Sequence, residues 1–99
     1  MVEIVKNSEG VFQFNIKSKS GHSLLQSISF KSEKEAKNTL QQTISNPIFE
    51  RQTNLQGKFV ISLKIKNGSF VGTSNTYSSE AGMENGIKNL RKGLNQNSL

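Results

Sequence analysis

The sequence predicts an α+β fold in which two tandem β-β-β-α repeats form one antiparallel sheet, with two helices packed on one of its faces. Three observations lead to this prediction. Residues 1–46 align without a gap with the residues 47 positions later, and eleven of those 46 pairs are identical, where this composition gives about four by chance. Segments of alternating polarity occupy equivalent places in both copies, and each copy ends in a segment of helical periodicity. We therefore expect a single domain, 1–99, made of two repeats, 1–46 and 48–94, related by a pseudo-two-fold axis.

The first repeat contains three stretches with strand character. Each is either rich in β-branched residues or alternates apolar and polar side chains, and turn-forming residues separate them. The alternation in the second stretch directs Phe12, Phe14 and Ile16 inward, and Leu24 is the expected inward residue of the third. The predicted strands are 2–6, 11–19 and 23–27, with turns at 7–10 and 20–21.

A helix follows the third strand. Ser32 and Glu35 form the capping-box pattern, in which the serine hydroxyl accepts an amide hydrogen and the glutamate reaches back. The helix ends by residue 46, because Pro47 disfavours a helical conformation in the residue before it. One apolar stripe can pack on the sheet, and it consists of Ala36, Leu40, Thr43 and Ile44.

The second repeat begins directly after this helix, without a linker. Its predicted strands are 48–52, 58–66 and 70–74. Asn67-Gly68 is a two-residue turn signal, since both residues tolerate a positive φ. The middle strand has the clearest alternation in the chain, and its inward residues are Phe59, Ile61, Leu63 and Ile65.

The second helix begins after Ser79, which is the counterpart of Ser32. Gly82 and Gly86 each lower helix stability by roughly 1 kcal/mol relative to alanine, which is tolerable where they allow a close approach to the sheet or to the other helix. Residues 95–99 form a polar tail that frays or adds an edge strand. The apolar stripe of this helix consists of Met83, Ile87, Leu90 and Leu94.

The composition restricts the classes of function. The chain has 99 residues, no cysteine and a net charge of +6. The absence of cysteine excludes disulfides and thiolate chemistry, and no stretch approaches the roughly 18 apolar residues of a membrane span, so we expect a soluble cytoplasmic protein. The positive charge favours anionic partners such as nucleic acid. Most of the cations are lysines, however, and bidentate reading of bases is mainly the work of arginine.

The sequence predicts no catalytic, metal or cofactor site. His22 is the single histidine and lies in a predicted turn, so neither a metal cluster nor a catalytic triad forms around it. Two pairs of glutamates are symmetry mates that a two-fold axis could bring together as paired carboxylates: Glu3 with Glu50, and Glu33 with Glu80. The second pair is also explained by favourable electrostatics at two helix N-termini.

Two Lys-x-Lys pairs occupy equivalent places on the outward face of the two middle strands. They are Lys17 with Lys19 and Lys64 with Lys66. If these strands lie near each other, four ammonium groups share the sheet face opposite the helices and bind a polyanion; the other interpretation is a solvated face. The phenylalanines of these strands are predicted to point inward, which leaves no exposed ring for base stacking.

These observations favour a non-enzymatic module that binds a protein or a polyanion. We expect it to be monomeric, because the duplication supplies internally the partner that a single repeat would need. One alternative is weak nucleic-acid binding through the lysine face. The least favoured alternative is an enzyme, since no nucleophile with a base can be assembled from the sequence. The identity of the partner does not follow from these patterns.

Several segments, all of them in the second repeat, carry a recognisable pattern. They are Gly57-Lys58-Phe59, Leu63-Lys64, Asn67-Gly68, Val71-Gly72-Thr73-Ser74, Tyr77-Ser78-Ser79 and Glu84-Asn85-Gly86-Ile87-Lys88-Asn89-Leu90. With them the chain resembles the YegP-like family of small bacterial repeat domains over nearly its whole length. The first repeat departs from the family pattern at Ser23 and at Thr39-Leu40. The resemblance implies a duplicated β-β-β-α unit with a pseudo-two-fold axis, and it implies no catalytic residues, because the family is known as uncharacterised.

Overall fold

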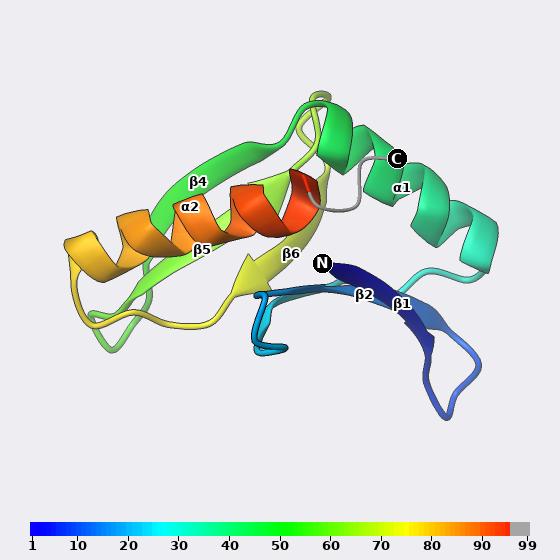
Figure 1. The fold of residues 1–99 in the computed structure, drawn as a ribbon, viewed down its shortest axis with the longest axis horizontal. Coiled ribbons are helices and arrows are strands. Elements are labelled where there is room, and N and C mark those ends of the chain that lie inside the picture. Colours follow the sequence, from blue (N-terminus) through cyan, green and yellow to red (C-terminus); the bar gives the residue numbers. More distant parts are fainter. Residues whose placement is uncertain (96–99) are drawn as a thin grey trace.

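The computed structural model describes residues 1–95 and contains two β-β-β-α units whose six strands form one antiparallel sheet (Figure 1). The strand order is β1-β2-β3-β6-β5-β4, and both helices lie on one face of the sheet, as the sequence predicted. The first unit contains β1 (Val2–Lys6), β2 (Phe12–Lys17), β3 (Ser23–Ser27) and α1 (Glu33–Ser45). The second contains β4 (Ile48–Thr53), β5 (Phe59–Lys64), β6 (Phe70–Ser74) and α2 (Glu80–Asn95).

The two units meet where β3 pairs with β6 at the centre of the sheet. Gln26 lies directly opposite Thr73, and these two residues are counterparts in the repeat, so the pseudo-two-fold axis passes between them. The backbones approach closely here, because a Cβ on Gly72 would lie 2.6 Å from the carbonyl oxygen of Gln26. Glycine at this position therefore allows the repeats to pair.

Each unit contains an irregularity in strand pairing at the same place in the repeat. The register shifts after Ile16 in the first unit and after Leu63 in the second, which leaves one additional residue, Leu24 or Val71, on the strand opposite. Such a bulge interrupts the alternation of faces. The prediction that Leu24 is the inward residue of β3 was therefore wrong in detail: Leu25 is 1% exposed, whereas Leu24 is half-buried against the edge of the core.

Strands β2 and β5 are shorter than the predicted 11–19 and 58–66, because the hairpin turns begin earlier. The amide of Ser18 donates to the carbonyl of His22 at 2.9 Å, and the equivalent amide of Ile65 donates to Ser69 at 3.0 Å. Lys19 and Lys66 consequently lie in turns and not on strands.

Both helices begin at the predicted serines. The hydroxyl of Ser32 accepts a hydrogen bond from the amide of Glu35 at 3.1 Å, and the Glu35 carboxylate accepts one from the amide of Lys31 at 3.2 Å. Ser79 caps α2 in the same way by accepting from the amide of Gly82 at 3.0 Å. The two serines therefore satisfy amides that would otherwise lack partners at the helix N-termini.

The hydrophobic core lies between the sheet and the helices, as the alternation of polarity predicted. α1 contributes Ala36 and Thr43 as buried residues, while Leu40 and Ile44 are half-buried and pack against the core. Of the predicted tail, Asn95 belongs to α2, and residues 96–99 lie outside the described residues. The central cluster consists of Phe14, Ile16, Leu25, Ile61, Leu63, Ile65, Val71, Met83, Ile87, Leu90 and Leu94.

Candidate anion-binding groove

The structure places the two Lys-x-Lys pairs at opposite ends of the sheet. β3 and β6 are antiparallel, so the β2–β3 hairpin and the β5–β6 hairpin point in opposite directions. Lys17 lies level with Ser23 and Lys64 lies level with Phe70. In the register of β3 with β6, Ser23 and Phe70 lie about six residues apart along the strand direction. This separation corresponds to roughly 20 Å. The four lysines are therefore not brought together in one cluster.

Two of these lysines are held by glutamates of their own repeat. The ammonium group of Lys17 lies 3.3 Å from a carboxylate oxygen of Glu3, and that of Lys64 lies 2.9 Å from Glu50. These ion pairs are counterparts in the two repeats. Glu3 and Glu50 thus each balance a lysine instead of meeting each other as paired carboxylates.

The other pair of symmetry-related glutamates lies at the helix N-termini. Glu33 forms an ion pair with Lys37 at 3.1 Å, and Glu80 is the first residue of α2. These positions fit the expected interaction of a carboxylate with the positive end of a helix dipole.

The sheet face opposite the helices is polar, and many of its side chains bond to one another. The Gln26 amide donates to the Gln13 side chain at 3.1 Å, and the Ser62 hydroxyl donates to the Gln52 side chain at 2.8 Å. Together with the two Lys–Glu pairs, these bonds satisfy much of the hydrogen-bonding capacity of this face. The face therefore offers few unpaired cations to a polyanion.

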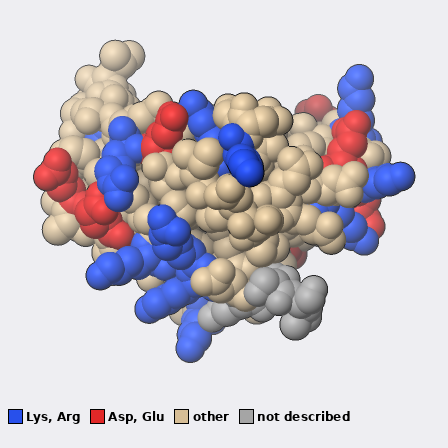
Figure 2. All heavy atoms as spheres, turned by 90° about the horizontal axis from the view of Figure 1, so that it is seen from above, with Lys and Arg blue, Asp and Glu red and all other residues tan. Residues whose placement is uncertain are grey.

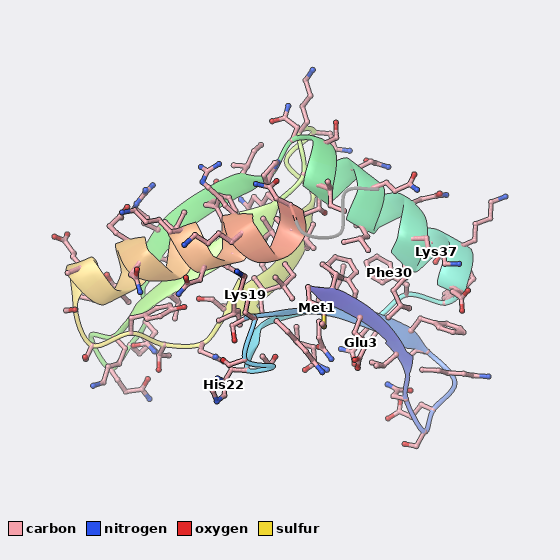
Figure 3. All side chains as sticks on the ribbon, viewed as in Figure 1. Met1, Glu3, Lys19, His22, Phe30 and Lys37 are labelled. Atoms are coloured by element: carbon pink, nitrogen blue, oxygen red, sulfur yellow. The ribbon has the colours of Figure 1, made fainter. Side chains whose placement is uncertain are left out.

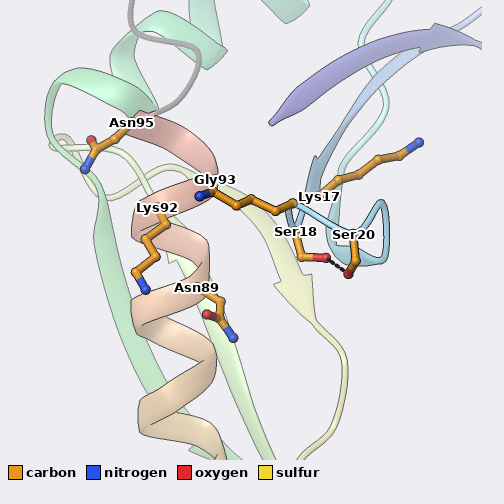
Figure 4. Close-up of a pocket in the computed structure, with 8 residues that line it drawn as sticks. Lys17, Ser18, Ser20, Asn89, Lys92, Gly93 and Asn95 are labelled. Carbon is orange, nitrogen blue, oxygen red and sulfur yellow. Dashed lines mark hydrogen bonds between the residues drawn. The ribbon is translucent and has the colours of Figure 1, made fainter.

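A groove of about 630 Å³ lies between the β2–β3 turn and the C-terminal half of α2 (Figure 4). Asn89 and Lys92 come from the helix, and Ser18 and Ser20 face them from the turn. Figure 3 shows that Lys19 extends from this turn toward α2. The described lining consists of Lys17, Ser18, Lys19, Ser20, Asn89, Lys92, Gly93 and Asn95.

Backbone contacts join the turn side of the groove to the helix side. The N-terminal amine of Met1 donates to the carbonyl of Lys17 at 3.1 Å and to that of Gly93 at 2.9 Å. Partial burial lowers the pKa of this amine, because desolvation disfavours its charged form. These bonds link the end of β2 to α2 and so fix the separation of the two walls.

The groove is electropositive. Lys19 and Lys92 form no ion pair with any carboxylate of residues 1–95, and the described lining contains no acidic residue. Figure 2 shows Lys and Arg side chains gathered over the surface formed by α2, at the lower left. The ammonium groups here remain available to an anion.

A second groove, of about 560 Å³, lies at the pseudo-symmetric position between α1 and the β5–β6 turn. Lys66 takes the place of Lys19, but Ser45 stands where the first groove has Lys92. The described lining consists of Asn38, Gln41, Gln42, Ser45, Asn46 and Lys66. The two grooves thus lie at equivalent positions in the two repeats, and of the two described linings only the first contains several lysines.

A third and smaller depression, of about 300 Å³, lies between β4 and the start of α2. An ion pair joins its walls: the guanidinium of Arg51 donates to both carboxylate oxygens of Glu84. The hydrogen bonds from Arg51 lower the pKa of Glu84. These two groups neutralise each other, and the other charged residue of the described lining is Glu80, so the depression does not share the positive charge of the first groove.

His22 lies in the β2–β3 turn, as predicted, and points away from α2 (Figure 3). Its Nδ1 is 2.8 Å from the hydroxyl of Ser20. Both residues belong to the same exposed turn, and no carboxylate of residues 1–95 is hydrogen-bonded to the ring. This is a local contact within a turn, without the acidic group that orients the base in a triad.

Sequence reasoning missed two features of the surface. Asn89 and Lys92 were not linked to Lys19, because only the tertiary structure shows that α2 packs beside the hairpin of the other repeat. Phe70 and Ile28 were not identified as exposed, yet they are 44% and 41% accessible. The alternation within β6 would have assigned Phe70 correctly only if the bulge at Val71 had been recognised.

Among residues 1–95, no three His, Cys, Asp or Glu side chains are grouped so that they could hold a metal ion. No described helix has the length and apolar character needed to cross a membrane.

Comparison with known proteins places the chain among others of similar fold. A family model described as a domain of unknown function (DUF1508) matches residues 55–94. The UPF0339 protein YegP of Yersinia pestis is 32% identical over 94 residues, which are 91% of this chain and 84% of the relative. The UPF0339 protein in the ptx operon 5' region of Stutzerimonas stutzeri is 31% identical over 93 residues, 90% of this chain and 84% of the relative.

Two solution NMR structures have the same architecture. That of YegP from E. coli, a protein of unknown function, superposes with a TM-score of 0.83 at 26% identity and covers 94% of this chain and 84% of that one. The structure of a UPF0339 protein from Shewanella oneidensis superposes with a TM-score of 0.85 at 31% identity, and the match covers 94% of this chain and 83% of that one. Since identities above 30% extend over about nine-tenths of the chain, the chain belongs to the UPF0339 (YegP) family.

Proposed function

We propose that this protein is a non-enzymatic binding domain that holds a phosphate-bearing anion in the groove between α2 and the β2–β3 turn. One observation carries the proposal: Lys19 from the turn and Lys92 from α2 line this groove, and its described lining contains no carboxylate. Cavities of this size commonly accept small ligands. An anion placed here would gain Coulomb attraction from at least two ammonium groups that have no ion-pair partner among the described residues.

The uncharged lining groups suit the same ligand. The hydroxyls of Ser18 and Ser20 and the amide of Asn89 line the groove and supply hydrogen-bond donors for phosphate oxygens. Lysine binds phosphate as a flexible point charge, so its ammonium group adjusts to several ligand shapes. Lys17 is oriented by Glu3 and would contribute less than Lys19 and Lys92.

A binding role is favoured over catalysis by the chemistry of the groove. Its described ionisable groups are all lysines, which are cationic at neutral pH. Ser20 contacts His22, but the ring belongs to an exposed turn and lacks a described acidic partner. General acid–base work is most often done by a positioned histidine or carboxylate, and the described lining of the groove contains neither.

The proposal moves the site of anion binding from the sheet face to the groove. On the sheet face, Lys17 and Lys64 are neutralised by Glu3 and Glu50. Lys19 and Lys66 each line a groove beside a helix. The grooves therefore account better for anion binding than a shared lysine face.

The experiment is a titration of the protein with inorganic tripolyphosphate, followed by backbone amide chemical shifts. We expect saturable shifts confined to the β2–β3 turn and the C-terminal half of α2. The variant Lys19→Gln/Lys92→Ser should lose at least about tenfold in affinity, because each lost charge contact is worth about 1 kcal/mol or more. The serine at position 92 reproduces Ser45, the equivalent residue of the second groove. This double variant should retain the wild-type fold, since the side chains of Lys19 and Lys92 are both exposed.

The second groove provides a gain-of-function control. Ser45→Lys places a lysine opposite Lys66, at the position equivalent to Lys92. We expect a second set of saturable shifts around this groove. Shifts spread over all exposed lysines, or an unchanged affinity of the Lys19→Gln/Lys92→Ser variant, would show that the groove is not the site.

A further inference from the structure

Positive charge extends beyond the groove along α2. Lys88 lies one helical turn before Lys92, so the two project on the same side of the helix, roughly 6 Å apart along its axis. No carboxylate among residues 1–95 forms an ion pair with Lys19, Lys88 or Lys92. We define these three residues as the cationic strip, which crosses the groove from the hairpin to the solvent side of α2.

The acidic residues of α2 do not interrupt the strip. Glu80 and Glu84 are confined to the N-terminal half of the helix, and Glu84 is neutralised by Arg51. The C-terminal half carries Lys88, Arg91 and Lys92 with no acid among them. A ligand longer than the groove would therefore meet further cations as it leaves the groove along the helix.

The strip lacks the groups that read bases. No aromatic residue is present in the described lining of the groove, so stacking is absent. The nearby guanidinium of Arg91 lies 4.8 Å above the ring centre of Phe49 and is directed toward β4. A lysine ammonium group contacts phosphates well. It lacks the planar guanidinium with which arginine makes two parallel hydrogen bonds to a base edge, so lysines alone do not distinguish bases.

The lining also argues against an acidic polypeptide as the ligand. Protein–protein interfaces contain an apolar centre with a polar rim, whereas this groove is lined by lysine, serine, asparagine and glycine. Interfaces with nucleic acids are more polar and far more positive. The net charge of +6 would add long-range attraction to a polyanion.

We infer that the anion bound by this groove is the sugar–phosphate backbone of a nucleic acid, contacted by the cationic strip without regard to sequence. This inference rests on the proposed function, because the same groove supplies the first contacts. Three lysine–phosphate contacts predict that log K falls with log salt concentration with a slope of about −2 to −3.

The test is fluorescence anisotropy with labelled oligonucleotides of about 20 nucleotides, between about 20 and 200 mM salt. Two unrelated sequences, each single-stranded and as a duplex, are compared with a labelled polyglutamate peptide of similar length. We expect the two sequences to bind within about threefold of each other and polyglutamate to bind at least about tenfold more weakly. The triple variant Lys19→Gln/Lys88→Gln/Lys92→Gln should lose most of the binding and most of the salt slope.

A matched control removes the same charge elsewhere. Lys31→Gln/Lys34→Gln/Lys58→Gln changes three exposed lysines outside the strip and leaves the same net charge, six minus three or +3. It should retain most of the affinity and the salt slope. Equal losses in both triple variants would overturn the inference, because binding would then follow net charge and not the strip.

The outcomes separate the inference from the proposed function. Tripolyphosphate binding in the groove without oligonucleotide binding would overturn the inference and leave the proposed function standing. A preference of more than about tenfold for one sequence, or tighter binding of polyglutamate, would also overturn it. If neither tripolyphosphate nor oligonucleotide binds the groove, both proposals fail.

Discussion

Gly86 shows how a single residue sets the distance between a helix and the sheet. The ring of Tyr77 occupies the space where a side chain would begin, and a Cβ on Gly86 would lie 2.5 Å from Cζ of that ring. Burial of the ring raises the pKa of the Tyr77 hydroxyl. In the first repeat, Phe30 and Thr39 stand at these two positions, so the close contact of ring and glycine belongs to the second helix alone.

The first prediction concerns this contact. Gly86→Ala should lower the free energy of unfolding by about 1–3 kcal/mol, because overpacking against the ring outweighs the roughly 1 kcal/mol that alanine gains in helix propensity. Urea denaturation of both proteins measures the difference.

Gly82→Ala is the matched control on the same helix. Its Cβ would lie 3.8 Å from the Tyr77 side chain and 3.2 Å from the capping hydroxyl oxygen of Ser79, so only this hydroxyl has to shift, by a few tenths of an ångström. We expect this variant to be as stable as the wild type or slightly more stable. Similar stability of the two alanine variants would contradict the packing role assigned to Gly86.

At the scale of elements, an ion pair links the edge of the sheet to a helix. Arg51 on β4 bonds to Glu84 on α2, and these elements are separated in the chain by β5 and β6. The hydrogen bonds from Arg51 hold the pKa of Glu84 below its ordinary value. Because the folded state has the lower pKa, the pair stabilises the fold above the unfolded pKa and loses this effect as the pH falls through the folded pKa.

This linkage predicts a change in the pH dependence of stability. Glu84→Gln should lower the melting temperature near pH 7, and the difference from the wild type should shrink as the pH falls through the lowered folded-state pKa of Glu84, where the carboxylate takes up a proton. Thermal melts of the variant and the wild type between pH 7 and pH 3 measure this difference in melting temperature. Arg51→Gln removes the partner and should give the same dependence. An identical difference at pH 7 and pH 3 would show that the pair does not contribute through charge.

At the scale of the whole molecule, the two repeats share one interior. The Cα radius of gyration is 13.0 Å, the value expected for a compact chain of about 100 residues. α2 contacts β2 and β3 of the first repeat as well as β5 of its own, and β3 pairs with β6. The monomeric state of the full chain remains a prediction.

The shared interior predicts that neither half folds alone. Residues 1–47 and 48–95, produced separately at low concentration, should each lack a cooperative thermal transition in circular dichroism, because each exposes the central strand and half of the core. An equimolar mixture should recover part of the native spectrum. A cooperative transition in either dilute half would contradict this account of the core.

Much of the fold could be predicted because the relevant signals are local. Ser32 and Ser79 mark the helix starts through their own hydroxyls, and the alternation around Phe14 and Ile61 identifies the buried face. Leu25 was missed because a bulge shifts the alternation within one strand. That shift depends on pairing with β2, and a single strand carries no signal of its partner.

The candidate site could be predicted only in part. Lys17 and Lys19 were identified from their spacing, and they line the groove. The expectation that they join Lys64 and Lys66 depended on the direction in which two equivalent hairpins point, and the antiparallel pairing of β3 with β6 separates them. Lys92 lies more than 70 residues from Lys19 in the chain, and only the packing of α2 brings it to the hairpin.

The sequence by itself determined that one β-β-β-α unit occurs twice, where its helices begin and which faces of its middle strands and helices point to the core, because repetition, capping and periodicity are properties of neighbouring residues. The tertiary structure decided which cations share a surface. Lys17 and Lys64 are paired with glutamates across neighbouring strands, while Lys19 and Lys92 face one groove. The physical reason is that Coulomb interactions depend on distance in space, and the two-fold arrangement of the repeats sets that distance.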